Sequence, residues 1–410
     1  MKKSADIKRA LLLLPSRSYR VSGFIAACSK GNAEIIIGVD DEQISESLGG
    51  GLVKRFNFAD PVVGAEEVVA FAEGRPFNAV IAAEEEAVLL AAHAAARLGI
   101  EHNSVESVMA CRDKNLLRVA LSEAGLLQPS FRLVGFDEPA TGWVPREFPC
   151  VVKPTSLSGS CGVIRANDQP EFIHAFNRVK KIALINSVSP PSGLLVEDYL
   201  PGMEIAIDAL IHRGEVHLLA VFVKPDPLCG PYFPETIYLT LSQDPDIDLC
   251  GLKSVLADAV AALGLSKGPV HAEFRVNATG IYVIEVAARS IGGQCGSCLR
   301  FSNGKTLEEI ILEYHLGETV PPYRLDERSF GVMMLPVPRN GVLQDIVGLD
   351  NARNTENIDS INITIPVGQP VESLPEGRRY LGFIFASSPN LEQTESALRK
   401  AYGALTVQIK

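Results

Sequence analysis

Short apolar runs alternate with helix-like segments through the first hundred residues. The runs "RALLLLP" (9–15), "AEIIIGVD" (33–40) and "PFNAVIAAEE" (76–85) have the length and continuity of buried strands. Between them, "YRVSGFIAACSKG" predicts a helix that ends at Gly31, and after them comes the alanine-rich helix "AVLLAAHAAARLGI". Strands that alternate with helices predict a parallel sheet covered on both faces. We expect this first α/β unit to end near residue 105.

The middle and the end of the chain have a different pattern. The segment "SVESVMACRDKNLLRVALSEAG" (104–125) has the periodicity of one amphipathic helix that ends at its final glycine. Strands and turns follow to about residue 200, then a mixed stretch that ends with "LEEIILEYHLGE" (307–318), and then strands, turns and one late helix. Because 410 residues exceed one ordinary core, we expect two or three packed units. The predicted fold class is α/β and α+β, multidomain.

Charge and hydropathy exclude several classes of function. The net charge is −11 and no block of lysines or arginines occurs, which argues against a nucleic-acid groove. No apolar run approaches the roughly 20 residues that a bilayer requires, so we expect no membrane span. The N-terminal leucine run has only four residues before Pro15, and Arg17 follows it. We therefore reject a secretory signal and expect a cytoplasmic protein.

Two familiar cofactor signals are absent or weak. The first predicted strand is followed by "PSRSYRVSG" and not by a GxGxxG turn, which argues against a dinucleotide site. Eight cysteines are scattered along the chain, and Cys295 and Cys298 form a CxxC without a second pair or a histidine at zinc spacing. We expect small buried fillers in a reducing compartment and not a redox or zinc site.

One lysine closes an apolar strand and precedes a loop of small residues. Lys153 ends the strand "CVVK", Pro154 follows it, and "TSLSGSCGV" (155–163) comes next. Small residues let backbone N–H groups approach an oxygen-rich ligand closely, and serines add donors. A lysine at a strand end is usually solvated, but beside such a loop its ammonium suits a triphosphate. We predict a phosphate clamp.

A strand, a short connector and a second strand occupy "GLLVEDYLPGMEIAID" (193–208). Backbone groups of the connector suit the edge of an adenine, and a carboxylate from Glu197 or Glu204 can accept hydrogen bonds from ribose hydroxyls. Surface charge on a hairpin is the alternative for each glutamate.

The segment "PVHAEFRVNATGIYVIEVAARSIGG" (269–293) is the most informative one. Two strands joined by "NATG" would bring Glu273 and Glu285 close together. Two carboxylates repel unless a cation lies between them, and Mg²⁺ shared with phosphates is such a cation. The run "IYVIEVAA" predicts burial on both faces, and two outward-facing glutamates are the alternative. Arg289 would lie by the metal and offer donors to a developing oxyanion.

These motifs, in this order and spacing, resemble the ATP-grasp superfamily over about residues 5–320. The matching features are a lysine in an early "RDK" segment, a strand lysine before a glycine-rich loop, an E-x-Y-L hinge, a ribose-binding glutamate, two magnesium glutamates and an arginine. The residues that the resemblance assigns to ATP are Lys114, Lys153, Ser158, Gly159, Ser160, Gly162, Glu197, Asp198, Tyr199, Leu200 and Glu204. It assigns Glu273 and Glu285 to Mg²⁺ or Mn²⁺, and Arg289 and Lys153 to catalysis.

The resemblance also implies a division of the chain. Residues 1–105 would form a Rossmann-like pre-grasp domain, and residues 106–325 the ATP-grasp domain, with a lid at about 110–200 and a larger half at about 200–325. Residues 326–410 would form a small α+β accessory domain. The C-terminal "YLGFIFAS" resembles the bacterial L-amino-acid ligase branch, which shares its superfamily with biotin carboxylases and glycinamide ribonucleotide synthetases.

Three positions extend or depart from this pattern. Ala287 stands where the superfamily often has an asparagine that completes a second metal site, so the number of metal ions can be one or two. The proline-rich stretch 224–242 should form a loop over the site that carries Glu235, a candidate substrate contact, and Tyr238. Glu84, in an acidic cluster after a strand, is a candidate for a substrate ammonium, and a solvated helix N-terminus explains it equally well.

The implied function is an ATP-dependent carboxylate–amine ligase that forms an amide bond through an acyl phosphate and releases ADP and phosphate. Arg289 and the backbone N–H groups of Gly292 and Gly293 would stabilise the tetrahedral intermediate. The expected partners are a small carboxylate, an amine and a second copy in a homodimer. A bicarbonate-activating carboxylase and a non-catalytic nucleotide-binding protein are the alternatives.

Overall fold

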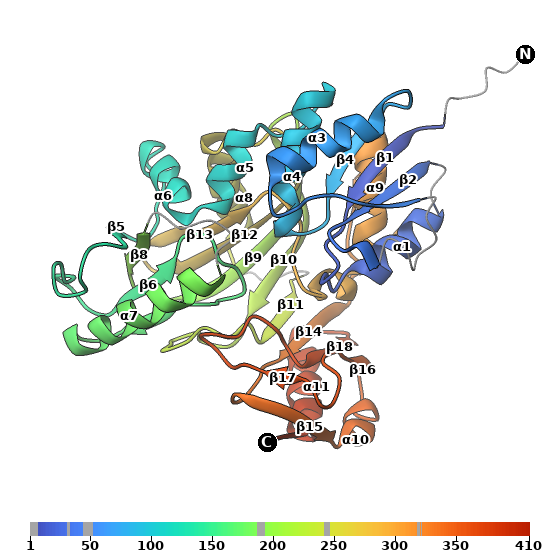
Figure 1. The fold of residues 1–410 in the computed structure, drawn as a ribbon. Helices are drawn as coiled ribbons and strands as arrows, with labels where there is room; N and C mark the ends of the chain where they lie inside the picture. Colours follow the sequence, from blue (N-terminus) through green and yellow to red (C-terminus); the bar gives the residue numbers. More distant parts are fainter. Residues whose placement is uncertain are drawn as a thin grey trace, which may run out of the picture.

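The computed structural model describes residues 7–30, 33–43, 52–186, 193–241, 247–317, 320 and 322–410. The predicted helix end at Gly31 and the last residues of the predicted segments 224–242 and 307–318 lie outside these ranges. The described residues form four sheets with helices packed against them (Figure 1).

The first unit contains a fully parallel sheet with the strand order β3-β2-β1-β4. Its strands are β1 (Arg9–Leu13), β2 (Glu34–Val39), β3 (Val53–Arg55) and β4 (Ala79–Ala82), and its helices are α1 (Val21–Lys30), α3 (Pro61–Ala72) and α4 (Val88–Leu98). Alternate β1 residues belong to two different cores: Leu12 packs with Phe24 of α1, and Leu11 packs with Leu90 of α4. The predicted sheet, parallel and covered on both faces, is confirmed.

The single helix predicted for 104–125 is wrong, because the segment forms α5 (Val105–Arg112) and α6 (Lys114–Glu123). Asp113 between them has an extended backbone, and its carboxylate accepts hydrogen bonds from the N–H groups of Asn115 and Leu116. An aspartate that satisfies these orphan N–H groups is a strong N-cap, so a new helix begins here. The break places Lys114 in the first turn of α6.

A four-stranded sheet with the order β5-β8-β6-β7 follows, and α7 (Gln169–Asn186) packs against it (Figure 1). Its strands are β5 (Phe131–Gly135), β6 (Cys150–Pro154), β7 (Ile164–Ala166) and β8 (Gly193–Asp198). All its pairs are antiparallel. Phe172 and Phe176 of α7 fill its core. The loop between β6 and β7 is the glycine-rich segment that the sequence indicated.

An eight-stranded antiparallel sheet forms the centre of the molecule, with the order β13-β12-β9-β10-β11-β14-β18-β16. Its strands are β9 (Met203–His212), β10 (Glu215–Lys224), β11 (Ile237–Thr240), β12 (Lys267–Asn277), β13 (Gly280–Ala287), β14 (Ser329–Leu335), β16 (Ile358–Ile363) and β18 (Gly382–Ser388). Helix α8 (Leu249–Ala262) packs on β10 and β13, and α9 (Leu307–Gly317) packs against α1 and β12. The sheet therefore connects the middle of the chain with its C-terminal part.

The C-terminal part adds a three-stranded sheet with the order β17-β15-β19 (Figure 1, orange and red). Its elements are β15 (Gly341–Val347), α10 (Leu349–Arg353), β17 (Pro370–Val371), α11 (Leu391–Gly403) and β19 (Thr406–Ile409). Helix α11 packs on β14 and β18 of the central sheet. None of the helices in the described ranges combines the length and apolarity that crossing a membrane requires.

Candidate active site

Glu273 and Glu285 face each other across the β12–β13 pair, where they are direct register partners. Their side chains are 16% and 28% exposed. The predicted pairing is confirmed. The burial predicted for the whole run "IYVIEVAA" is wrong in part, because β13 is the edge strand of its sheet and Tyr282 and Ile284 remain partly exposed.

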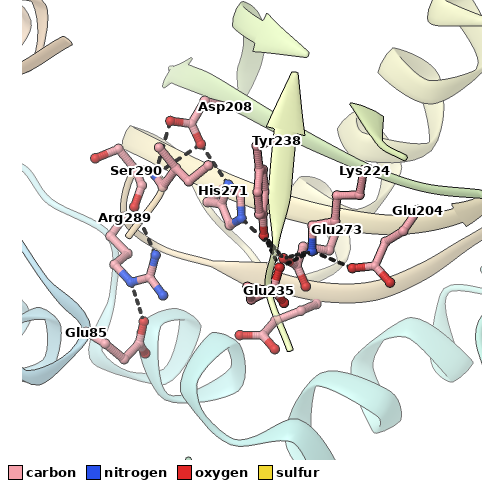
Figure 2. Close-up of polar contacts among 12 residues, drawn as sticks. Glu85, Glu204, Asp208, Lys224, Glu235, Tyr238, His271, Glu273, Arg289 and Ser290 are labelled. Carbon is pink, nitrogen blue, oxygen red and sulfur yellow. Dashed lines mark hydrogen bonds and ion pairs between the residues drawn. The ribbon is translucent and has the colours of Figure 1, made fainter. Parts of the chain in front are cut away.

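A buried lysine lies among three carboxylates (Figure 2). Lys224 Nζ is 2.8 Å from Glu235 Oε2 and 2.9 Å from Glu273 Oε1, and it also pairs with Glu204. Burial alone would lower the pKa of Lys224, but the three carboxylates outweigh it and raise the pKa well above its ordinary value. The three glutamates can bring ligand oxygens within 4.8 Å of one another. Because the ammonium already compensates them, this cluster does not require a metal ion.

Of the two residues expected on a loop over the site, Glu235 lies on the loop before β11 and Tyr238 lies within the strand. Tyr238 is a buried residue of β11, so the loop prediction is wrong for it. Its phenol donates a hydrogen bond to Glu235 (2.5 Å), and the same oxygen lies 3.2 Å from Glu273 Oε1. Burial raises the pKa of Glu235 to about 7, with Lys224 opposing the rise and Glu273 adding to it. Glu235 therefore points into the carboxylate cluster (Figure 2).

His271 lies beside Glu273 on β12 and opposite Ala287 in the β12–β13 register. Its Nδ1 is 2.8 Å from Asp208 Oδ1, and its Nε2 is 3.6 Å from Glu273 Oε1 (Figure 2). Burial lowers the pKa of His271, but the contacts with Asp208 and Glu273 prevail and raise it to about 9. Burial would also raise the pKa of Glu273, yet Lys224 and His271 hold it well below its ordinary value. Glu273 is therefore an ionised carboxylate.

Lys114 connects Glu285 with the glycine-rich loop. Its Nζ donates a hydrogen bond to the carbonyl of Leu157 (2.9 Å) and lies 3.4 Å from Glu285 Oε2. Its backbone N–H donates to the carbonyl of Thr155 (2.8 Å). The lysine of the "RDK" segment, one metal candidate and the phosphate-loop candidate are thus in contact.

Lys153 is buried and paired. Its Nζ lies 2.6 Å from one oxygen of Glu197, whose other oxygen accepts a 2.6 Å hydrogen bond from Arg118 Nε. Arg118 also donates to the carbonyl of Ile284 on β13 (2.7 Å). Burial lowers the pKa of Lys153 to about 8; Glu197 opposes the fall, and Arg118 and Lys114 add to it. Because the positive charge of Lys114 helps to lower the pKa of Lys153, the two ammonium groups lie near each other.

The glycine-rich loop has the backbone of an anion-binding turn. Gly159, Ser160 and Gly162 have φ angles of 63°, 58° and 73°, in the left-handed region that favours glycine. Successive residues of this kind can aim N–H groups at one anion. The carbonyl of Ser158 accepts the N–H of Cys161 (3.4 Å) and closes the turn.

The hinge 197–200 is only partly available to an adenine. The N–H groups of Asp198 and Tyr199 donate to the carbonyls of Ser130 (3.0 Å) and Pro149 (3.1 Å). Across the described residues, no acceptor is found for the N–H of Leu200. The side chain of Glu197 is committed to its two cations, so its predicted contact with ATP is not supported by its position. Leu200 offers the free donor.

Glu204 has cations on both oxygens. It is opposite Arg275 in the β9–β12 register, and Arg275 Nη2 lies 2.8 Å from Glu204 Oε2, while Lys224 pairs with Oε1. A carboxylate has about four lone-pair positions, so hydroxyl donors can still bind.

Arg289 links the central sheet to the first unit (Figure 2). Its Nε donates to Glu85 (2.8 Å) and its Nη1 to the carbonyl of Ser290 (2.9 Å). Burial disfavours the charged guanidinium, but the surrounding carboxylates, Glu85 first, outweigh it and raise the pKa of Arg289. A Cβ added at Gly292 would lie 3.6 Å from Arg289 Nη1, and Gly293 has a φ of 62°. Gly292 therefore lies next to the arginine, and Gly293, with its left-handed backbone, follows it in the chain.

Glu84 lies beside Glu85 but has a different partner. It accepts a 2.7 Å hydrogen bond from the hydroxyl of Ser18. Burial raises its pKa, although Arg20 and Arg289 oppose the rise. Glu84 is thus a partly exposed carboxylate near the arginine, and it precedes the short 3-10 helix Glu85–Ala87 without capping it.

Four site residues were not predicted from the sequence: Lys224, His271, Asp208 and Arg118. Lys224 ends "AVFVK" as Lys153 ends "CVVK", so the same signal, an apolar strand closed by a lysine, applies to it. His271 precedes Glu273 by two residues and so shares its face of β12. Nothing in the local pattern of α6 distinguishes the fully buried Arg118 from a solvated arginine.

Two family models match the chain. Residues 146–298 match the ATP-grasp domain, and residues 333–410 match the L-amino acid ligase C-terminal domain 2. The first match contains the glycine-rich loop, Lys224 and both facing glutamates. The chain therefore contains an ATP-grasp domain. The resemblance inferred from the motifs is confirmed, including the ligase-type C-terminal part.

Two relatives of known name match this chain over part of their length. Dapdiamide A synthase of Enterobacter agglomerans is 27% identical over 219 residues, which are 51% of this chain and 50% of that protein. Alanine–anticapsin ligase of Bacillus subtilis (strain 168) is 26% identical over 271 residues, which are 60% of this chain and 56% of that protein. The chain thus covers about half the length of these relatives.

Solved structures match nearly the whole chain. An L-amino acid ligase from Bacillus licheniformis superposes with a TM-score of 0.79 at 24% identity and covers 98% of this chain and 99% of its own. A carboxyaminoimidazole ribonucleotide synthase from Aspergillus clavatus, solved in complex with ATP, gives a TM-score of 0.71 at 16% identity, with 97% and 98% covered. These likenesses establish the fold, and the predicted ATP-grasp fold is confirmed.

Proposed function

We propose that this protein is an ATP-dependent carboxylate–amine ligase that forms an amino-acid amide or dipeptide-like bond through an acyl phosphate. The observation that carries the proposal is a connected set of charges: Lys114 joins the glycine-rich loop to Glu285, which is the register partner of Glu273 and lies near Arg289. The match of residues 333–410 to an L-amino acid ligase domain, and relatives named as a synthase and a ligase, support it.

ATP would lie between the lid (about 110–200) and the larger half (about 200–325) of an ATP-grasp domain over 106–325. Residues 1–105 would be the pre-grasp domain, and 326–410 the accessory domain. We assign the adenine edge to the N–H of Leu200 and the ribose to Glu204. The phosphates would meet the N–H groups of Gly159 and Ser160 in the glycine-rich loop. The ammonium groups of Lys114 and Lys153 would oppose the repulsion between phosphate oxygens.

A magnesium or manganese ion fits the facing pair Glu273 and Glu285. Both supply hard carboxylate oxygens, and Glu273 is held ionised. When bound, such an ion neutralises β- and γ-phosphate charge. Ala287 offers no ligand atom, and Nδ1 of its cross-strand partner His271 is engaged with Asp208, so we propose one protein-held ion.

The chemistry would take two steps. A carboxylate oxygen of the acid attacks the γ-phosphorus in line, an O–P bond forms, the bond to the β-bridging oxygen breaks, and ADP leaves. The amine nitrogen then attacks the acyl carbon, a C–N bond forms, the C–O bond to phosphate breaks, and the amine proton passes to solvent. Arg289 and the N–H groups of Gly292 and Gly293 would stabilise the oxyanion between these events.

Carboxylates of the site are candidate binding groups for the substrates. We propose that Glu84 binds the ammonium of an amino-acid substrate, because it is partly exposed and, within the described ranges, only the Ser18 hydroxyl forms a hydrogen bond with it. Glu235 would contact substrate from the opposite side, where its raised pKa lets it donate or accept a hydrogen bond near pH 7.

A phosphate-release screen over pairs of amino acids and small carboxylates tests the proposal. We expect release that requires ATP, an acid and an amine together, with strong loss in Lys153→Ala and in Glu285→Gln. Release stimulated by bicarbonate and not by amino acids would indicate a carboxylase-type enzyme. ATP binding without ADP release under any pair would indicate a non-catalytic protein.

We further propose that the protein is a cytoplasmic homodimer. Sedimentation equilibrium of the purified chain tests the dimer, since the mass of one chain is 44.1 kDa.

A further inference from the structure

A cavity of about 420 Å³ lies where three segments meet. One wall is Gly159 of the glycine-rich loop, a second is the proline-rich segment 231–234, and the third comes from the C-terminal part, at 336–338 and 372–380. Apart from Gly159, none of these lining residues has a role in the site described above.

The walls are held together by direct contacts. The N–H of Gly162 donates to the carbonyl of Pro375 (2.8 Å). Arg178 of α7 forms two hydrogen bonds with Glu376, at 2.7 and 2.9 Å, and a third with the phenol of Tyr232 (2.7 Å). Arg178 therefore fixes both the C-terminal wall and the proline-rich wall. The shape of the cavity is maintained by these hydrogen bonds.

The lining combines an apolar surface with an excess of positive charge. The lining includes four prolines and two tyrosines, Tyr232 and Tyr380. Arg378 and Arg379 also line it, with Glu372 as the acidic residue, so the lining has a formal charge of +1 (two positive charges minus one negative). Both arginines are exposed, and no ion pair involves either of them within the described ranges. The cavity suits an apolar body that carries an anionic group.

The cavity reaches the proposed reaction centre at one end. Pro234 of its lining immediately precedes Glu235, whose carboxylate is paired with Lys224. Burial raises the pKa of Tyr380 well above its ordinary value, and the nearby carboxylate of Glu235 adds to the rise. Gly159 at another side belongs to the loop that would cover the γ-phosphate. A molecule in the cavity would therefore lie next to a forming acyl phosphate.

We propose that this cavity receives the amine substrate, and that Arg378 and Arg379 select amines that carry a carboxylate. The inference rests on the ligase function proposed above. It gives the C-terminal part a direct role in the choice of acceptor: the carboxylate binds at the two guanidinium groups, the apolar body lies along the prolines and tyrosines, and the amine points toward Glu235. Each guanidinium can donate two parallel N–H hydrogen bonds to a carboxylate. A neutral or apolar group on the amine would not form this charged, paired contact.

The first part of the test separates this inference from the ligase proposal. Hydroxylamine is a small amine without a carboxylate, and it captures an acyl phosphate as a hydroxamate. Wild-type protein is supplied with ATP, Mg²⁺, hydroxylamine and each acid of the phosphate-release screen. If no acid yields a hydroxamate, the ligase proposal itself fails. If hydroxamate forms while no carboxylate-bearing amine is accepted, the inference about the cavity is wrong and the ligase proposal stands.

The second part measures selectivity. Each amino-acid acceptor from the screen is compared with its own primary amide in wild type, Arg378→Gln, Arg379→Gln and the double variant. We expect wild type to prefer the amino-acid acceptor over its amide. In the double variant, the KM for the amino-acid acceptor should rise roughly 10–100-fold, the range for losing charge-assisted hydrogen bonds. Arg353→Gln, at an exposed arginine of α10 outside the cavity, is the matched control. Equal KM values for acid and amide in wild type, or an unchanged preference in the double variant, would overturn the proposal.

Discussion

Replacing Glu197 by glutamine tests whether this residue is a buried counter-ion or a contact for ATP. In the structure its carboxylate is 4% exposed and holds two cations, Arg118 and Lys153, each at 2.6 Å. Glutamine keeps the size and the hydrogen-bonding shape of the side chain but removes the charge. Two buried cations would then face each other without an anion, a situation that proteins avoid.

The expected loss of stability follows from these contacts. Removing one partner of a buried ion pair costs about 3–5 kcal/mol, because the remaining charge is left uncompensated. We take a guanidinium m-value of roughly 4 kcal/mol per molar for the unfolding of the unit that contains the lid. Such a loss would lower its midpoint concentration of guanidinium by about 1 M. Part of the loss returns if Arg118 is replaced by methionine as well, since only Lys153 then remains unpaired.

Guanidinium unfolding monitored by circular dichroism measures this shift. Asp198→Asn is the matched control, because Asp198 is exposed on the same hinge, and its change should stay within about 0.5 kcal/mol. If Glu197→Gln unfolds within 1 kcal/mol of wild type while ATP affinity collapses, the residue is a ligand contact and the counter-ion explanation is refuted.

Two further predictions concern the reaction. Burial lowers the pKa of Lys153 to about 8, so its ammonium loses its proton as the pH rises through that value. The KM for ATP should therefore increase above pH 8. A KM that stays constant to about pH 9.5 would contradict this. Lys153→Arg, which stays charged, should remove the pH dependence. Glu85→Gln takes the carboxylate from Arg289, so kcat for amide formation should fall about tenfold or more, while Glu86→Gln at the exposed neighbouring position should not change it. Equal kcat values in the two variants would show that Glu85 does not position the arginine.

Much of the fold and of the facing glutamates could be predicted because their signals are local. A buried parallel strand needs a continuous apolar run, and the first unit has three of them. The turn "NATG" sets the register that makes Glu273 and Glu285 partners. Strand β3 has two exposed residues of three and no such run, so no local signal indicated it.

The unpredicted parts depend on contacts between segments far apart in the chain. Arg118 and Glu197 are 79 residues apart, and nothing near either one shows that they are paired. The N-cap at Asp113 competes with a helical pattern that continues on both sides, which is why one helix was expected. The central sheet takes strands from both sides of residue 325, so pattern along the chain cannot show where a packed unit ends.

The central claim is that one divalent cation, bound by the facing glutamates, brings the ATP phosphates to the lysines beside the glycine-rich loop. Anomalous diffraction from a crystal grown with Mn²⁺ and a non-hydrolysable ATP analogue measures this directly. The account predicts one strong manganese peak coordinated by both Glu273 and Glu285, with phosphate oxygens in contact with Lys153. A peak among Glu204 and Glu235 instead, or a triphosphate bound away from Lys153, would contradict it.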